Sequence, residues 1–139
     1  MKLLLFTQAI DRQDSYLSFF YEWMVEFARE AEHIHVICLK KGDVGEVPAN
    51  VTIHSLGKEE GVSRLTYVAR LFSYVWKLRA EYTHVFVHMN QEYVLLCGWL
   101  WRLLGKKITM WRNHQDGSWL TNIAAAFTHR LFCTSRFSY

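Results

Sequence analysis

The sequence predicts an α/β fold in which a mostly parallel β-sheet carries helices on both of its faces. Short apolar runs alternate with helix-period segments along the chain, which is the pattern of such a sheet. The second and third runs follow one another without a helix between them. A length of 139 residues, with 51% hydrophobic and 21% charged residues and one proline, suits a single ordinary core. We therefore expect one domain over residues 1–139.

The chain is expected to begin with a buried strand and a long helix. Lys2–Thr7 (KLLLFT) is apolar throughout, as expected of a strand covered on both faces. A polar loop, Gln8–Asp14, follows it. Asp14 or Ser15 can cap a helix that ends near Glu32. The apolar stripe of this helix consists of Phe20, Trp23, Met24 and Phe27.

Two further strands and a second helix are expected in the middle of the chain. The strands are His33–Leu39 and Val51–Ser55, and Ser63 can cap a helix that ends near Tyr82. Helical spacing predicts a core face made of Leu65, Val68, Ala69, Phe72, Val75 and Trp76. A second stripe combines aromatic and basic side chains, namely Tyr67, Arg70, Tyr74 and Lys77.

Three strands and two helices are expected in the last part of the chain. The strands are His84–His88, Lys107–Met110 and Leu131–Thr134. A helix over Glu92–Leu104 is apolar nearly all round and ends at Gly105, a good C-cap position. A short helix is expected over Ser118–Thr128.

This order of elements predicts where a ligand would bind. Right-handed crossovers give a Rossmann-like three-layer sandwich in which the first and fourth strands are neighbours. Ligands of such sheets bind outside the carboxyl ends of the strands, where the strand order reverses. Three polar loops are expected to meet there, namely Gln8–Asp14, His88–Glu92 and Arg112–Ser118.

Several classes of protein are disfavoured by the missing motifs. No GxGxxG follows the first strand and no P-loop is present, which argues against a dinucleotide domain and a nucleotide triphosphatase. A response regulator would need paired acids directly after the first strand, whereas Asp11 and Asp14 lie in the loop. A net charge of +3 without a run of five basic residues does not indicate nucleic acid.

The cysteines and the apolar runs predict a cytoplasmic protein without a metal site. Cys38, Cys97 and Cys133 lie far apart in apolar runs, which suggests reduced core thiols, and no Cys/His spacing fits zinc. The apolar stretch at the N-terminus is too short for a signal peptide. The longest such stretch, residues 94–104, is too short to span a bilayer. The mixed basic and aromatic stripes, which include Trp99, Trp101 and Arg102, could rest on an anionic membrane surface, although ordinary exposed faces look the same.

The segment MWRNHQDGSW contains the strongest candidate residues. His114 lies just past a strand end, where an imidazole could exchange a proton or hydrogen bond with a sugar hydroxyl, or could simply be solvated. Arg112 could clamp a phosphate or carboxylate, or could be a charge that ends the strand. Asp116 or Ser118 is expected to cap the helix that follows, although its N-terminus could also hold an anionic group.

Further candidates lie in the other two loops. His88 and Asn90 end the fourth strand and could line the crevice, although a histidine bonded to the backbone is the favoured interpretation of His88. Asp11 and Arg12 could contact a polar substrate, although a solvated loop is the commoner case.

Several of these segments together resemble a known family. The leading KLLLFT, the aromatic-rich first helix, HVFVHMN, KKITMWRNHQDGSW and LFCTSRFSY are similar to the N-terminal domain of GT-B glycosyltransferases. The likeness is greatest to glycosyltransferase family 4, the "group 1" enzymes of bacterial polysaccharide and glycolipid assembly. It covers almost the whole chain, and its best single cue is an aromatic residue at a strand end followed by a histidine, here Trp111 and His114.

The resemblance implies transfer of a sugar from a nucleotide sugar to a saccharide or lipid-linked acceptor, without a metal or other cofactor. His114 would reach the donor sugar, and the loop with Gln8, Asp11 and Arg12 would line the acceptor side. The first loop lacks the glycines common in the family. The family's C-terminal domain, which carries most of the nucleotide-sugar site and a pair of glutamates, is not found in these residues, so we expect an acceptor-side half that is inactive alone.

Two other functions fit the residues. One is a free-standing Rossmann-like module that binds a nucleotide or small anion without catalysis. The other is an interaction domain with no ligand.

Overall fold

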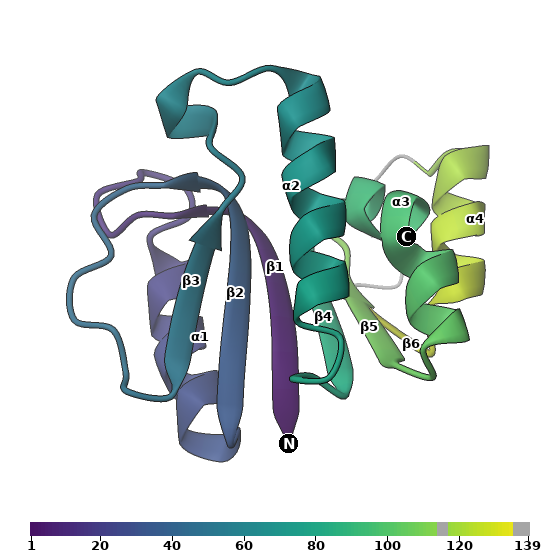
Figure 1. The fold of residues 1–139 in the computed structure, drawn as a ribbon, viewed down its shortest axis with the longest axis horizontal. Coiled ribbons are helices and arrows are strands. Elements are labelled where there is room, and N and C mark those ends of the chain that lie inside the picture. Colours follow the sequence, from purple (N-terminus) through teal and green to yellow (C-terminus); the bar gives the residue numbers. More distant parts are fainter. Residues whose placement is uncertain (114–116, 135–139) are drawn as a thin grey trace.

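The structure, a computed structural model, describes residues 1–113 and 117–134. Its six described strands form one sheet in the order β3-β2-β1-β4-β5-β6, and all five pairings are parallel (Figure 1). The strands are β1 (Lys2–Ile10), β2 (His33–Lys41), β3 (Val51–Ser55), β4 (His84–His88), β5 (Lys107–Trp111) and β6 (Arg130–Phe132). The predicted Rossmann-like sheet, with its first and fourth strands adjacent, is confirmed.

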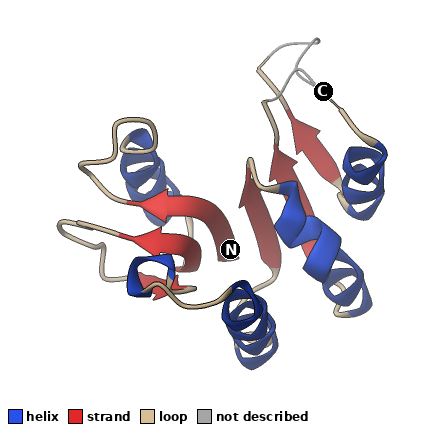
Figure 2. Ribbon diagram, turned by 90° about the horizontal axis from the view of Figure 1, so that it is seen from above, coloured by secondary structure: helices blue, strands red, loops and turns tan. Residues whose placement is uncertain are grey.

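Helices cover both faces of this sheet (Figures 1 and 2). One face carries α1 (Phe19–Glu30), and the other carries α2 (Arg64–Lys77), α3 (Gln91–Leu103) and α4 (Trp119–Phe127). Alternate residues of β1 therefore enter different cores: Leu3 and Leu5 pack with α1, whereas Leu4 and Phe6 pack on the opposite side. Burial on both faces explains why β1 is apolar throughout.

The first connection differs from its prediction. β1 continues to Ile10, because Ala9 and Ile10 are buried and pair with β2 beyond the expected end of the strand. Helix α1 begins at Phe19 instead of Asp14 or Ser15. The carboxylate of Asp14 accepts hydrogen bonds from the backbone N–H groups of Tyr16 and Leu17, both at 2.8 Å. Asp14 therefore closes a turn before the helix. In a sequence, an aspartate that closes such a turn looks the same as one that caps a helix.

Helix α2 is rotated relative to the prediction. Ser63 does cap it, since its hydroxyl accepts from the N–H of Thr66, but the helix ends at Lys77. Leu65 and Trp76, expected in the core, are 83% and 52% exposed. The buried side chains are Leu71 and Val75, with Tyr67 and Tyr74 packed against the same core. The predicted aromatic and basic stripe of α2 is therefore partly interior. Trp101, assigned to a similar mixed stripe near the end of α3, is fully buried.

The remaining differences are small. Helix α3 begins one residue earlier and ends one residue earlier than predicted, and Gly105 adopts the left-handed conformation expected of a residue after a helix end. The last strand is shifted toward the N-terminus, and β5 gains Trp111. Burial raises the pKa of the Cys38 and Cys97 thiols to about 12, as suits core cysteines, but Cys133 is exposed and is not part of the core.

Candidate functional site

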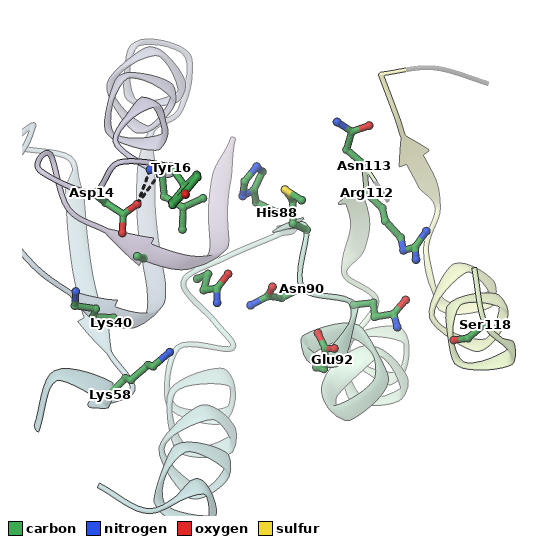
Figure 3. Close-up of a pocket in the computed structure, with 15 residues that line it drawn as sticks. Asp14, Tyr16, Lys40, Lys58, His88, Asn90, Glu92, Arg112, Asn113 and Ser118 are labelled. Atoms are coloured by element: carbon green, nitrogen blue, oxygen red, sulfur yellow. Dashed lines mark hydrogen bonds between the residues drawn. The ribbon is translucent and has the colours of Figure 1, made fainter. Parts of the chain in front are cut away.

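A cavity of about 940 Å³ lies at the carboxyl ends of the strands, where the strand order predicts a ligand site (Figure 3). Residues from the ends of β1, β2, β4 and β5 and from the starts of α3 and α4 line it. Figure 3 shows Lys40 and Lys58 on one side, His88 and Asn90 in the middle, and Arg112 and Ser118 on the other side. The cavity has the size of a small-molecule site.

The turn between β4 and α3 forms the middle of the cavity. Met89 has a φ of 62°, a left-handed conformation that is uncommon for a residue other than glycine. The turn is held by hydrogen bonds from the Met89 N–H to the carbonyl of Trp111 and from the Asn90 N–H to the carbonyl of His88. Asn90 is the N-cap of α3 but makes no side-chain cap bond. Its side chain lines the cavity and forms a hydrogen bond with the side chain of Tyr93. Strained backbone of this kind is concentrated at functional sites.

His88 lies in the wall of the cavity, with its ring packed among three aromatic residues of α1. The ring centroids lie 4.8 Å from Phe20, 5.6 Å from Trp23 and 5.8 Å from Phe19. The side chain is 2% exposed and forms no hydrogen bond with the residues that the structure describes. The expected bond between this imidazole and the backbone is therefore not found. Burial lowers the pKa of His88 to about 4, so the imidazole is neutral near pH 7.

Two lysines give one side of the cavity its positive charge. Lys40 extends from β2, and Lys58 begins the short 3₁₀-helix η1 (Lys58–Glu60) after β3. Neither ammonium group forms an ion pair with another described residue. The pKa of Asp14, which also lines the cavity, lies below its usual value, chiefly because its carboxylate accepts the two backbone hydrogen bonds and also because Lys40 is near. Asp14 is therefore ionised near pH 7.

Arg112 and Ser118 belong to the far side of the cavity. Arg112 is buried at the end of β5, and its N–H donates to the carbonyl of Phe132 in β6. Ser118 caps α4 in a capping box with Thr121, in which each side chain accepts a backbone hydrogen bond from the other residue. The predicted cap of the last helix is therefore confirmed for Ser118.

The structure brings together four of the predicted site residues. Gln8, His88, Asn90 and Arg112 all line the cavity. His114 and Asp116 lie outside the described residues, so their predicted roles stay predictions.

Asp11 and Arg12 do not line the cavity, because both are used to join the first loop to the loop after β2. The Asp11 carboxylate accepts from the N–H groups of Gln13 and Asp43. The Arg12 guanidinium lies 5.1 Å from the ring centre of Tyr21, over its face. A residue other than glycine at position 42 would place its Cβ 2.1 Å from the Asp11 carboxylate, which is why this loop crossing needs Gly42.

Sequence reasoning missed Lys40 and Lys58 as lining residues. The signal was available for the two lysines. The rule that ligands bind at the carboxyl ends of strands was applied to the first, fourth and fifth strands, and it applies equally to the second and third.

No group of three or more His, Cys, Asp or Glu side chains in the described ranges could hold a metal ion. No helix in the same ranges is long and apolar enough to cross a membrane.

Two solved structures share this fold over nearly the whole chain. The first is UDP-GlcNAc 2-epimerase from Methanocaldococcus jannaschii, with a TM-score of 0.61 and 12% sequence identity over 99% of this chain and 40% of the epimerase chain. The second is Anabaena HepE in complex with UDP, with a TM-score of 0.62 and 15% identity over 99% of this chain and 39% of the HepE chain. No protein-family model and no curated protein sequence matches the chain.

These likenesses show the fold, a Rossmann-like α/β domain of the GT-B type. The chain spans about two fifths of the length of each solved structure. At 12% and 15% identity they do not extend to glycosyltransferase family 4, which stays a prediction.

Proposed function

We propose that this chain is the acceptor-side half of a glycosyltransferase that moves a sugar from a nucleotide sugar to a saccharide or lipid-linked acceptor. The observation that carries the proposal is the polar cavity at the carboxyl edge of a parallel GT-B type sheet, lined by Gln8, Asn90, Arg112 and two lysines. Both similar structures support a nucleotide-sugar reaction, since one is an epimerase of UDP-GlcNAc and the other contains UDP.

In the proposed reaction the acceptor hydroxyl forms a bond to the anomeric carbon of the donor sugar. The bond from that carbon to the phosphate oxygen of the nucleotide breaks, the nucleotide leaves with the electron pair of that bond, and its phosphate accepts the hydroxyl proton. Asn90 can orient sugar hydroxyls from the strained turn, and Arg112 can stabilise negative charge on the departing phosphate. His88 is neutral near pH 7 and shapes the wall of the cavity.

The donor's nucleotide is proposed to bind chiefly in a second domain, because the chain matches only about 40% of the two nucleotide-sugar proteins. We propose that His114 approaches the donor sugar from this half and that no metal or organic cofactor takes part. The alternative function is that of a free-standing module that binds a nucleotide or a small anion without catalysis.

The test is a transfer assay on the protein made from its whole reading frame, with labelled nucleotide sugars and both classes of acceptor. His114→Ala and Asn90→Ala are each expected to lower kcat by about 10²-fold, the cost of removing one group that contacts the transition state. Asn122→Ala, an exposed asparagine of α4 outside the cavity, is the matched control and should keep full activity.

Three results would contradict the proposal. Transfer that is unchanged in Asn90→Ala would remove the cavity from the site. Conversion of a UDP-sugar in the absence of any acceptor would favour an epimerase instead. Binding of a nucleotide by a protein that transfers nothing to any acceptor would favour the binding module.

A further inference from the structure

A second, mainly apolar groove opens beside the polar cavity. It has a volume of about 330 Å³, at the lower end of the range of ligand pockets. Its walls come from the first half of α2, from α3 and from the ends of β2 and β3, and include Leu39, Leu56, Tyr67, Val68, Leu71 and Leu96. The groove and the cavity are neighbours, because Gln8, Asn90 and Glu92 line both.

Two lysines that line the cavity lie close in sequence to residues that line the groove. Leu39 lines the groove and the next residue, Lys40, lines the cavity. Leu56 lines the groove, and Lys58, two residues further on, lines the cavity. The end of β2 and the segment that follows β3 thus each contribute an apolar side chain to the groove and a lysine to the cavity.

This alternation matches the chemistry of one class of molecule. An apolar chain gains about 0.8 kcal/mol for each methylene that it buries, so it favours the groove. A phosphate favours a position beside ammonium groups that have no ion-pair partner among the described residues. A saccharide beyond the phosphate would then reach Asn90 in the middle of the polar cavity.

We infer that the acceptor is a lipid phosphate, in which an aliphatic chain occupies the groove, the phosphate lies beside Lys40 and Lys58, and the sugar-bearing end enters the cavity. The inference rests on the proposed function and selects the lipid-linked acceptor over the free saccharide.

The test measures binding of the 139-residue chain to inorganic phosphate and to ethyl, butyl, hexyl and octyl phosphate, all below their micelle concentrations. The dissociation constant is expected to fall by roughly fourfold for each methylene that enters the groove, which is 0.8 kcal/mol converted to an affinity ratio. Amide signals of groove residues on α2 should shift with octyl phosphate and not with inorganic phosphate.

Two pairs of variants separate the contribution of the aliphatic chain to binding from the contribution of the phosphate. Val68→Asn places a polar group in the groove and should flatten the dependence on chain length, whereas Ala69→Asn, on the exposed side of the same helix, should leave it unchanged. Lys58→Gln should weaken every member of the series by a similar factor, and Lys77→Gln, an exposed lysine at the other end of α2, should not. Leu96→Gln replaces Val68→Asn if that variant fails to fold.

The outcomes are distinguishable. Affinity that does not depend on chain length, or Val68→Asn that behaves like Ala69→Asn, would overturn the inference and leave the proposed transferase intact. Chain-dependent affinity that Lys58→Gln does not weaken would overturn the phosphate position. A protein that transfers sugar to free saccharides and not to lipid phosphates would overturn the inference alone. A protein that transfers to neither class would overturn the proposed function, whatever the alkyl phosphates do.

Discussion

His88 and His35 lie at different ends of the sheet, and burial lowers the pKa of both imidazoles. His35, near the amino end of β2, has a partner on each ring nitrogen: Nδ1 lies 3.1 Å from Nε2 of His54, and Nε2 lies 3.1 Å from the Glu81 carboxylate. His88, at the carboxyl end of β4, packs against aromatic rings of α1 and lines the cavity.

The difference shows how the two ends of the sheet are used. Near the amino ends, polar side chains satisfy one another, and the contacts of His35 join β2, β3 and the segment before β4. At the carboxyl ends, polar groups such as Asn90, Lys40 and Lys58 face a cavity. Polar side chains from several segments that converge on one cavity, at the end of the sheet where they do not pair with one another, indicate a ligand site.

The largest expected effect concerns the packing that surrounds His88. Phe20→Ala removes a fully buried ring against this imidazole and should lower the free energy of unfolding by about 3–5 kcal/mol. Solvent would then reach the imidazole, so the pKa of His88 should rise toward its usual value. Urea denaturation and an NMR titration measure the two effects. Phe19→Ala, whose ring is partly exposed, is the control, and an equal loss in both variants would contradict the role of Phe20.

The next effect is the dependence of stability on pH. The pKa of His88 is lower in the folded chain, at about 4, than in the unfolded chain, at about 6.5, so the unfolded state binds the proton first. Its contribution is complete above pH 6.5 and is lost as the pH falls toward 4, by up to about 3 kcal/mol. The pKa values of His35 and His54 are also lowered, chiefly by burial, so both act in the same direction.

Histidine variants measure how much each end of the sheet contributes to this loss of stability in acid. His88→Gln should lose less stability than the parent chain between pH 6.5 and pH 4, and His35→Gln should also reduce the loss. Unfolding free energies measured by urea at several pH values give the slopes. A slope that His88→Gln leaves unchanged would show that His88 titrates normally.

A smaller effect is expected from the capping serines of α4 and α2. Ser118→Ala removes the capping box of α4 and should lower the free energy of unfolding by about 1 kcal/mol. Ser63→Ala removes a simpler cap from α2 and should cost less, since its bond to the Thr66 N–H is not reciprocated by a side chain. Thermal unfolding followed by circular dichroism compares the two, and the reverse order would argue against the capping box.

The smallest effect is expected at the strained turn. Met89→Gly relieves the left-handed conformation but gives the unfolded chain more freedom, so the two terms oppose one another. The free energy of unfolding should change by less than about 1 kcal/mol. Met89→Val, which puts a β-branched residue at positive φ, should be clearly destabilised. If both variants unfold like the parent chain in urea, Met89 is not held in this conformation.

Much of the site was predictable because the strand order follows from local patterns. Gln8, His88, Asn90 and Arg112 were predicted to line a crevice, and they do so because each follows or ends a strand at the carboxyl edge. Asp11 and Arg12 follow β1 yet both bond to the backbone of Asp43, so their contacts depend on the path of a loop about thirty residues later. Local sequence does not contain that path.

By itself, the sequence determined the layers of this protein, because the alternation of apolar runs and helical periods specifies which segments are strands and how many helices must cover them. It also determined the carboxyl edge as the place of the site, since right-handed crossovers leave one strand order. Only the tertiary structure decided which face of α2 is buried, that His88 lies among the rings of α1, and that an apolar groove lies beside the polar cavity. These features depend on contacts between segments that are distant along the chain, and such contacts arise when the layers pack.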